Sequence, residues 1–145
     1  MRGYAAVALE NPKCLANLGG AMRAAQCYGA SLIVVGGPRM ERLSKLATDT
    51  MKAYRSVPSI QILDVFDAIP YDCVPVAVEL VDGARDLRRY THPERAFYVF
   101  GPEDSSLGAR VLSRCRDKVS IPTRGCMNLA ATVNVVLYDR LSKQP

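Results

Sequence analysis

Short apolar runs of strand length recur along this chain and constrain its fold more than any other feature of the sequence. The run at residues 31–35 is rich in branched residues and closes on Gly36, Gly37 and Pro38. Continuous runs of this kind, in which polar and apolar residues do not alternate, favour parallel strands that are covered on both faces. The strands expected from the pattern are residues 4–9, 31–35, 60–63, 74–78, 96–100 and 119–121.

Segments with helical spacing separate these runs. Residues 17–28 include Ala, Met and Gln, which favour helix, and Gly29 ends the segment. Further helices are expected at residues 39–53, 64–69, 109–116 and 128–141. The alternation predicts an α/β domain with a mostly parallel sheet flanked by helices, whose ligand lies beyond the carboxyl ends of the strands.

Length and composition narrow the class of protein. The 145 residues fit a single domain, residues 1–145. The 19 basic and 14 acidic residues give a net charge of +5, which suits a partner that carries phosphate but equally fits a solvated basic surface. No stretch approaches the roughly eighteen apolar residues of a membrane span, and no signal peptide is apparent. We therefore expect a soluble protein with no membrane segment.

Cysteine and histidine usage argues against two kinds of stabilising site. The five cysteines are an odd number with no C-x-x-C pair, and His92 is the only histidine. This pattern supports neither a disulfide framework nor a metal site, and a reducing, cytoplasmic setting is the simpler inference. His92 lies in a Tyr-Thr-His-Pro segment, which indicates an exposed turn.

Three loops are placed where apolar runs give way to small or polar residues. They are residues 17–23 (NLGGAMR), 100–108 (FGPEDSSLG) and 121–129 (IPTRGCMNL). In the third, Pro122 lacks a backbone donor and Gly125 permits conformations closed to other residues, so the chain can fold tightly against a flat ligand. Loops at strand ends predict one shared binding site.

The polar residues of these loops also have simpler interpretations. Asn128 suits the cap of the last helix, and Glu103 suits the cap of the helix that starts near residue 108. Arg23, on a first helix, is ordinarily a surface residue or an ion-pair partner. On the residues alone, these alternatives stay open.

In order and spacing, the three loops resemble the signature motifs of the SpoU branch of the SPOUT RNA methyltransferases. The resemblance rests on Asn17-x-Gly19-x-x-x-Arg23, on Gly101-x-Glu103-x-x-x-Leu107, and on Ile121-Pro122 followed by Cys126-Met127-Asn128-Leu129. It covers nearly the whole chain, which is similar to the family's smallest members, the methyltransferases of the tRNA wobble ribose. The resemblance implies a C-terminal trefoil knot, an exception to the rule against threaded chains. It further implies a homodimer that completes the active site, and S-adenosyl-L-methionine as cofactor.

Catalytic roles follow from the same resemblance. It implies that Arg23 polarises the ribose 2′-hydroxyl or a neighbouring phosphate, for which a planar guanidinium is suited. Asn17 would fix Arg23 or the ribose, and Glu103 would orient an arginine across the dimer. Asn128 is the fourth catalytic candidate.

Cofactor contacts are implied at the ends of three strands. These candidates are Glu79, Gly101, Ile121, Cys126 and Met127. The contact at Glu79 is expected through backbone, which leaves its side chain free to face solvent. Cys126 stands where the family usually has serine, and a thiol is a weaker hydrogen-bond donor than a hydroxyl.

Basic residues in loops are the candidates for RNA contact, namely Lys13, Arg85, Arg88, Arg89 and Arg124. Each alone is ordinarily a solvated charge, so the hypothesis concerns the patch as a whole. Tyr138 lies within an apolar helical pattern, which predicts a place in the core or in the dimer interface.

The leading hypothesis is an S-adenosylmethionine-dependent RNA 2′-O-ribose methyltransferase that acts on tRNA. Ribosomal RNA is the alternative substrate, because larger members of the family act there and nothing in the motifs reads RNA sequence. A module that binds RNA or cofactor without turnover is an alternative from another class. A dinucleotide-binding domain is disfavoured because no G-x-G-x-x-G follows the strand at residues 4–9.

Overall fold

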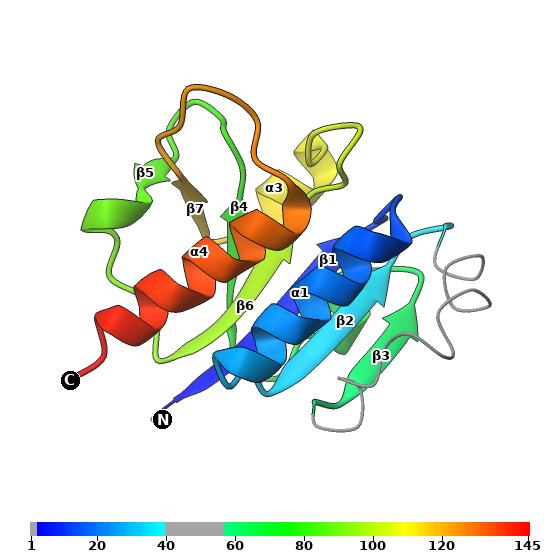
Figure 1. Cartoon of the computed structure of the whole chain (residues 1–145), viewed down its shortest axis with the longest axis horizontal. Helices are drawn as coiled ribbons and strands as arrows, with labels where there is room; N and C mark the ends of the chain where they lie inside the picture. Colours follow the sequence, from blue (N-terminus) through cyan, green and yellow to red (C-terminus); the bar gives the residue numbers. More distant parts are fainter. Residues whose placement is uncertain (1–2, 40–56) are drawn as a thin grey trace.

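The computed structural model describes residues 3–39 and 57–145, and its framework is a parallel β-sheet. Within these residues the sheet has seven strands in the order β3-β2-β1-β6-β4-β7-β5, and every pairing is parallel (Figure 1). The strands are β1 (Tyr4–Glu10), β2 (Leu32–Gly36), β3 (Ser59–Ile62), β4 (Val74–Val78), β5 (Arg85–Asp86), β6 (Arg95–Phe100) and β7 (Asp117–Ser120). The predicted α/β class with a parallel sheet is confirmed.

Helices cover both faces of this sheet. On one face α1 (Leu15–Cys27) and α4 (Leu129–Ser142) lie side by side, as Figure 1 shows. The 3₁₀ turn η2 (Val65–Ala68) and the short helix α3 (Ala109–Arg114) pack on the other face. A second 3₁₀ turn, η3 (Leu87–Arg89), follows β5 directly.

Strand β1 shows why the apolar runs do not alternate with polar residues. Successive side chains of a strand point to opposite faces. Val7 and Leu9 pack beneath α1 and α4, whereas Ala6 and Ala8 belong to the core on the other face. Both faces are therefore buried, and both require apolar side chains.

A glycine allows α1 and α4 to approach closely. A Cβ atom placed on Gly20 would lie 2.7 Å from the Cβ of Ala130, nearer than such atoms pack. The two motif-bearing helices can therefore lie this close only because Gly20 has no side chain to collide with Ala130.

Four local expectations differ from the structure. The helix expected at residues 64–69 is the 3₁₀ turn η2, where Asp64 accepts a hydrogen bond from the Phe66 amide and so starts a tighter turn. Strand β5 and η3 lie in a segment for which no element was expected. Strand β7 begins at Asp117, two residues before the strand expected at 119–121, and the expected start is late because the first two residues of β7 are charged and break the apolar pattern. The helix expected at residues 39–53 has Arg39 in a turn and otherwise lies outside the described residues.

Two further expectations concern α4 and the path of the chain. Tyr138 is 60% exposed, so its predicted place in the core is wrong, whereas a place in a dimer interface stays a prediction. The trefoil knot also stays a prediction.

In the described part of the chain, no helix has the length and apolar character needed to cross a membrane.

His92 does not lie in an exposed turn, and that prediction is wrong. Its side chain is only 5% exposed. Nδ1 lies 2.6 Å from the hydroxyl of Tyr98, and Nε2 lies 2.7 Å from the carboxylate of Asp139. Arg140 donates to the same Tyr98 hydroxyl at 3.1 Å and to the Pro93 carbonyl at 2.6 Å. The partners on α4 are distant in sequence, so the local turn pattern could not reveal them.

This buried histidine predicts a loss of stability in mild acid. Burial lowers the pKa of His92 below its ordinary value of 6.5, although the Asp139 carboxylate opposes the shift, and Lys143 and Arg140 add to it. Because the unfolded chain binds the proton more readily, stability is full above pH 6.5 and falls as the pH drops below it. Between pH 7.5 and 5.5 the native chain should therefore lose unfolding free energy through this group, within the limit of about 1.4 kcal/mol per pH unit that one titrating group can contribute.

Urea unfolding of the native chain and of His92→Gln at both pH values measures the effect. The variant should show a smaller loss, since glutamine keeps hydrogen-bonding capacity without titrating. An equal loss in the two proteins would remove His92 as the titrating group.

Candidate active site

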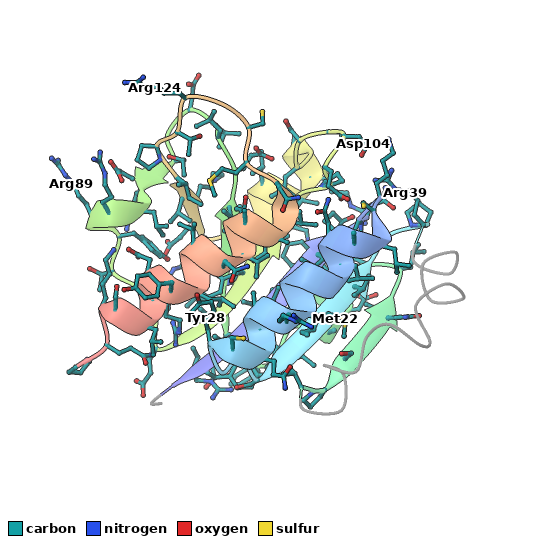
Figure 2. All side chains as sticks on the ribbon, in the orientation of Figure 1. Met22, Tyr28, Arg39, Arg89, Asp104 and Arg124 are labelled. Atoms are coloured by element: carbon teal, nitrogen blue, oxygen red, sulfur yellow. The ribbon has the colours of Figure 1, made fainter. Side chains whose placement is uncertain are left out.

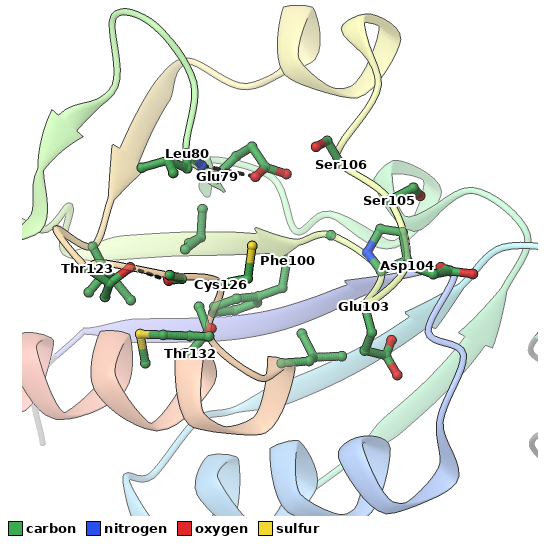
Figure 3. Close-up of a pocket in the computed structure, with 17 residues that line it drawn as sticks. Glu79, Leu80, Phe100, Glu103, Asp104, Ser105, Ser106, Thr123, Cys126 and Thr132 are labelled. Atoms are coloured by element: carbon green, nitrogen blue, oxygen red, sulfur yellow. Dashed lines mark hydrogen bonds between the residues drawn. The ribbon is translucent and has the colours of Figure 1, made fainter.

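The carboxyl ends of β4, β6 and β7 open into one cavity of about 380 Å³, a size typical of small-molecule sites (Figure 3). Its floor is apolar and its rim carries polar loops. The residues that line it are Val78, Glu79, Leu80, Phe100, Gly101, Pro102, Glu103, Asp104, Ser105, Ser106, Ile121, Thr123, Gly125, Cys126, Met127, Leu129 and Thr132.

All five residues predicted to contact a cofactor line this cavity. They come from the loops after β4, β6 and β7, which the parallel sheet brings to one edge. Gly101 is confined by its surroundings, because an added Cβ would lie 3.2 Å from the Leu107 side chain and 3.3 Å from Glu79 Oε2. A larger residue at position 101 would therefore push into the cavity wall. Their contact with a cofactor stays a prediction.

The Glu79 side chain does not simply face solvent. Its Oε2 accepts a hydrogen bond from the Leu107 amide at 2.9 Å, and its Oε1 accepts one from the Leu80 amide at 3.0 Å. The Glu79 amide itself donates to the carbonyl of Val119 at 3.0 Å. Glu79 thus joins the ends of β4, β6 and β7. Nothing in the sequence marks Leu107, 28 residues away, as its partner.

Glu103 caps a helix from a distant part of the chain. Its Oε1 accepts from the Lys13 amide at 3.0 Å and its Oε2 from the Cys14 amide at 2.7 Å. Cys14, at the N-cap of α1, makes no side-chain cap of its own. The capping expected for α3 is not observed, since its N-cap Gly108 also lacks a side-chain cap. Glu103 therefore supplies an acceptor for the N-cap amide of α1 and another for the amide just before it.

Two asparagines extend this contact across all three motif segments, the first of which, residues 17–23, lies within α1 and is not the loop expected from the sequence. Asn17 Nδ2 donates to Glu103 Oε2 at 3.1 Å, and Asn17 Oδ1 accepts from Asn128 Nδ2 at 2.6 Å. Asn128 Oδ1 in turn accepts from the Ala131 amide at 3.0 Å, so it caps α4 as well. The simple interpretation of Asn128 as a cap is correct, and the same side chain also joins α4 to α1.

The charge state of Glu103 follows from these contacts. Burial favours the neutral acid, but hydrogen bonds from Lys13, Asn17 and Cys14 outweigh it, so the pKa of Glu103 lies below its ordinary value. The group is therefore an ionised acceptor at neutral pH. Its oxygens are already engaged with donors, an arrangement that suits orientation of neighbours better than proton abstraction.

Arg23 is the catalytic candidate that does not join this cluster. It is exposed on α1 and does not line the cavity. Six residues separate it from Asn17, which places it about 9 Å further along the helix and on a different side. The structure thus brings together Asn17, Glu103 and Asn128 and leaves Arg23 outside.

The predicted RNA contacts fall into two places. Arg85, Arg88 and Arg89 lie in β5 and η3, and Figure 2 shows Arg89 and Arg124 projecting outward at that end of the molecule. Arg88 is held by Asp86 at 2.6 Å, although its side chain is largely exposed. Lys13 lies apart, at the start of α1.

Several cavity residues were missed by sequence reasoning. Leu80 follows β4 and is 71% exposed at the rim, and Thr132 lies in the first turn of α4. No motif signals either one. Thr123, Ser105 and Ser106 belong to the motif loops, and their place in those loops was the available signal.

A parallel α/β sheet with a cavity at its carboxyl edge is the architecture of domains that bind nucleotide-like ligands there. The three hydrogen-bonded motif segments then define the group more closely. This chain belongs to the SpoU rRNA Methylase family, whose family model matches residues 4–138.

Solved structures share this fold. The SpoU methyltransferase AviRb from Streptomyces viridochromogenes, in complex with AdoMet, is 21% identical with a TM-score of 0.79, covering 99% of this chain and 61% of that one. An AdoMet-bound rRNA methyltransferase from Sinorhizobium meliloti is 23% identical with a TM-score of 0.80, covering 98% and 57%. This chain thus spans about three fifths of the length of these two proteins.

A third structure is nearer to this chain in length. It was solved for structural insights into the 2-OH methylation of C/U34 on tRNA, and it is 23% identical with a TM-score of 0.75, covering 99% of this chain and 92% of that one. A comparison with curated proteins found no significant match.

Proposed function

We propose that this protein transfers the methyl group of S-adenosyl-L-methionine to a ribose 2′-hydroxyl of RNA, at the wobble nucleotide of a tRNA anticodon loop. The observation that carries the proposal is the hydrogen-bonded chain Glu103–Asn17–Asn128, which unites the three motif segments beside the cavity that Glu103 lines. Family membership and the AdoMet complexes of two structural relatives support it.

The cavity residues fit an S-adenosylmethionine molecule. The floor of the cavity, formed by Val78, Phe100 and Leu129, suits a flat ring. The loops around Gly101 and Ile121 offer backbone amides and carbonyls. Cys126 and Met127 close the wall nearest α4. The cofactor supplies an already activated methyl group, so the protein has to position it and exclude water.

The remaining chemical problem is the proton of the ribose hydroxyl, because a protonated hydroxyl is a poor nucleophile. Arg23 would hold the hydroxyl or the adjacent phosphate with a planar guanidinium and so stabilise the deprotonated oxygen. The proton itself would pass to water, because arginine stays protonated and cannot accept it. Since Arg23 lies outside the cavity of its own chain, the arginine comes from a second copy. Asn17 and Glu103 orient the groups at the rim.

The proposed homodimer is supported by this position of Arg23 and by the exposed apolar side chains of α4. Val135, Tyr138 and Leu141 are 37%, 60% and 41% exposed, and their spacing places them on one side of the helix. Exposed apolar side chains gathered in this way are typical of protein interfaces. The Tyr138 ring also contacts Tyr28, the C-cap of α1, with 6.2 Å between the ring centroids.

Transfer RNA is preferred over ribosomal RNA because the tRNA-methylating relative is matched over nearly its whole length. The basic residues of β5, η3 and the Arg124 loop are the proposed contact for the RNA backbone, and Lys13 is a second contact beside the cavity.

The decisive experiment incubates purified protein and labelled S-adenosylmethionine with a tRNA pool, with ribosomal RNA and with no RNA, and then maps the methyl group. Ribose methylation at the wobble position supports the proposal. Methylation of ribosomal RNA alone would overturn the substrate. Cofactor binding by calorimetry without transfer to either RNA would favour a binding module.

Cys126 allows a test of the cavity itself. Replacement by serine, the residue usual in the family, adds a stronger hydrogen-bond donor at the cavity wall. Cys126→Ser should therefore tighten cofactor binding or raise turnover by about fivefold, the value of one neutral hydrogen bond. Calorimetry and single-turnover rates measure it, with Cys27→Ser on the exposed end of α1 as control. A weaker or slower Cys126→Ser protein would contradict the expected contact.

A further inference from the structure

We propose that Arg39, in the turn after β2, is a positioning residue for methyl transfer. It fixes the loop that carries Glu103, and this inference rests on the proposed function. No motif contains Arg39, and it lies outside the cavity. Its effect on the reaction would be exerted through Asp104 and Glu103.

Arg39 contacts two segments of the chain, through Asp104 in the loop after β6 and through Asn11 after β1. Nη1 donates to Asp104 Oδ2 at 2.9 Å and Nη2 donates to Asp104 Oδ1 at 3.1 Å, which is a two-point grip on the carboxylate. Nη2 also donates to the carbonyl of Asn11 at 2.5 Å, and the Arg39 amide donates to Asn11 Oδ1 at 3.2 Å. Figure 2 shows Arg39 and Asp104 next to each other. One guanidinium therefore connects the end of β1 to the loop after β6.

Asn11, the residue that Arg39 contacts after β1, is itself held against the end of β2. The Asn11 amide donates to the Gly36 carbonyl at 2.9 Å, and Asn11 has a positive φ of 51°. Gly37 packs on Asn11 so closely that an added Cβ would lie 2.5 Å from the Asn11 Cβ. Arg39 is thus held by a tight turn, and its side chain is only 28% exposed. Such a fixed arginine can impose its position on Asp104.

Asp104 is the immediate neighbour of Glu103, whose two oxygens meet Lys13, Cys14 and Asn17. At the far end of the same loop, Glu79 holds the Leu107 amide. The loop is therefore anchored at Asp104 by Arg39 and at Leu107 by Glu79, and Glu103 lies directly before the Arg39 anchor. Loss of the Arg39 anchor frees the half of the loop that presents Glu103, and displacements of about 1 Å can slow an enzyme up to a hundredfold.

The test combines kinetics with amide hydrogen exchange. In Arg39→Ala the transfer rate at saturating cofactor and RNA should fall about tenfold, while the cofactor Kd stays within about twofold. The Lys13 and Cys14 amides, which Glu103 holds, should exchange at least about fivefold faster. Arg95→Ala is the matched control, because Arg95 also pairs with a carboxylate, Asp72 at 2.7 Å, but at the opposite end of β6. Normal transfer or unchanged exchange in Arg39→Ala would overturn the inference.

Two further variants separate positioning from general stability. Arg39→Lys keeps the charge but loses the two-point grip, so it should retain the fold and still transfer slowly. Asp104→Ala combined with Arg39→Ala should be no slower than the slower single variant if the two act together, and multiplied losses would contradict the pairing. If the native protein transfers no methyl group, the proposed function fails, and the exchange measurement alone decides whether Arg39 holds Glu103.

Discussion

Replacement of Arg23 by alanine should abolish most methyl transfer to RNA and leave S-adenosylmethionine binding nearly intact. Arg23 does not line the cavity, so its loss removes no contact there. The proposed role is exerted on the ribose hydroxyl or its phosphate, and removal of one donor to developing charge costs about a hundredfold or more in rate. Arg23→Lys should recover little, because lysine cannot grip two oxygens in one plane.

Calorimetry with the cofactor and single-turnover transfer to RNA measure the two halves of this prediction. Arg110→Ala serves as control, since Arg110 is an exposed arginine on α3, on the face opposite α1. Undiminished transfer by Arg23→Ala would remove Arg23 from its proposed role. A large loss of cofactor affinity would place it in the cavity instead.

Mixed dimers test whether the arginine acts across two chains. Gly101→Val should close the cavity, because even a Cβ at this position lies 3.2 Å from the Leu107 side chain. In the proposed homodimer, a mixture of Arg23→Ala and Gly101→Val chains should give hybrid dimers with one intact site and so restore about a quarter of native activity. Without restoration, the arginine would have to act within its own chain.

Sequence reasoning found most of the fold because the apolar runs of β1, β2, β4 and β6 are buried on both faces. The pattern missed strand residues that are charged and strands that are very short. Strand β7 begins with Asp117, whose carboxylate accepts from the Tyr90 hydroxyl at 2.8 Å, a partner far away in the chain. Strand β5 has only two residues, too few for a pattern.

The site was predictable where residues belong to ordered motifs. All five cofactor candidates line the cavity, and three of the four catalytic candidates are hydrogen-bonded together. Long-range polar contacts were not predictable. Glu79 with Leu107, His92 with Asp139, and Arg39 with Asp104 join positions 28, 47 and 65 residues apart, and no local spacing encodes such pairs. These pairs form because the sheet topology brings distant segments of the chain together.

Glu103→Ala is expected to impair both stability and transfer. The variant leaves the Lys13 and Cys14 amides without their acceptor at the start of α1, and it releases Asn17. Loss of a helix cap costs about 1 kcal/mol. Transfer should fall by about a hundredfold, because Asn17 and Asn128 then lose the contact that fixes them at the rim. Asp67→Asn, an exposed acid on η2, is the matched control.

The pH dependence of this stability loss identifies the carboxylate as its cause. The donors around Glu103 outweigh burial and hold its pKa below the ordinary 4.5. A lowered folded pKa means that the stabilisation is complete above the unfolded value and is lost as the pH falls through the folded one. The gap in unfolding free energy between the native chain and Glu103→Ala should therefore be constant from pH 7 to about 5 and shrink below about 4. A gap that persists unchanged in acid would show that the ionised carboxylate is not what holds the start of α1.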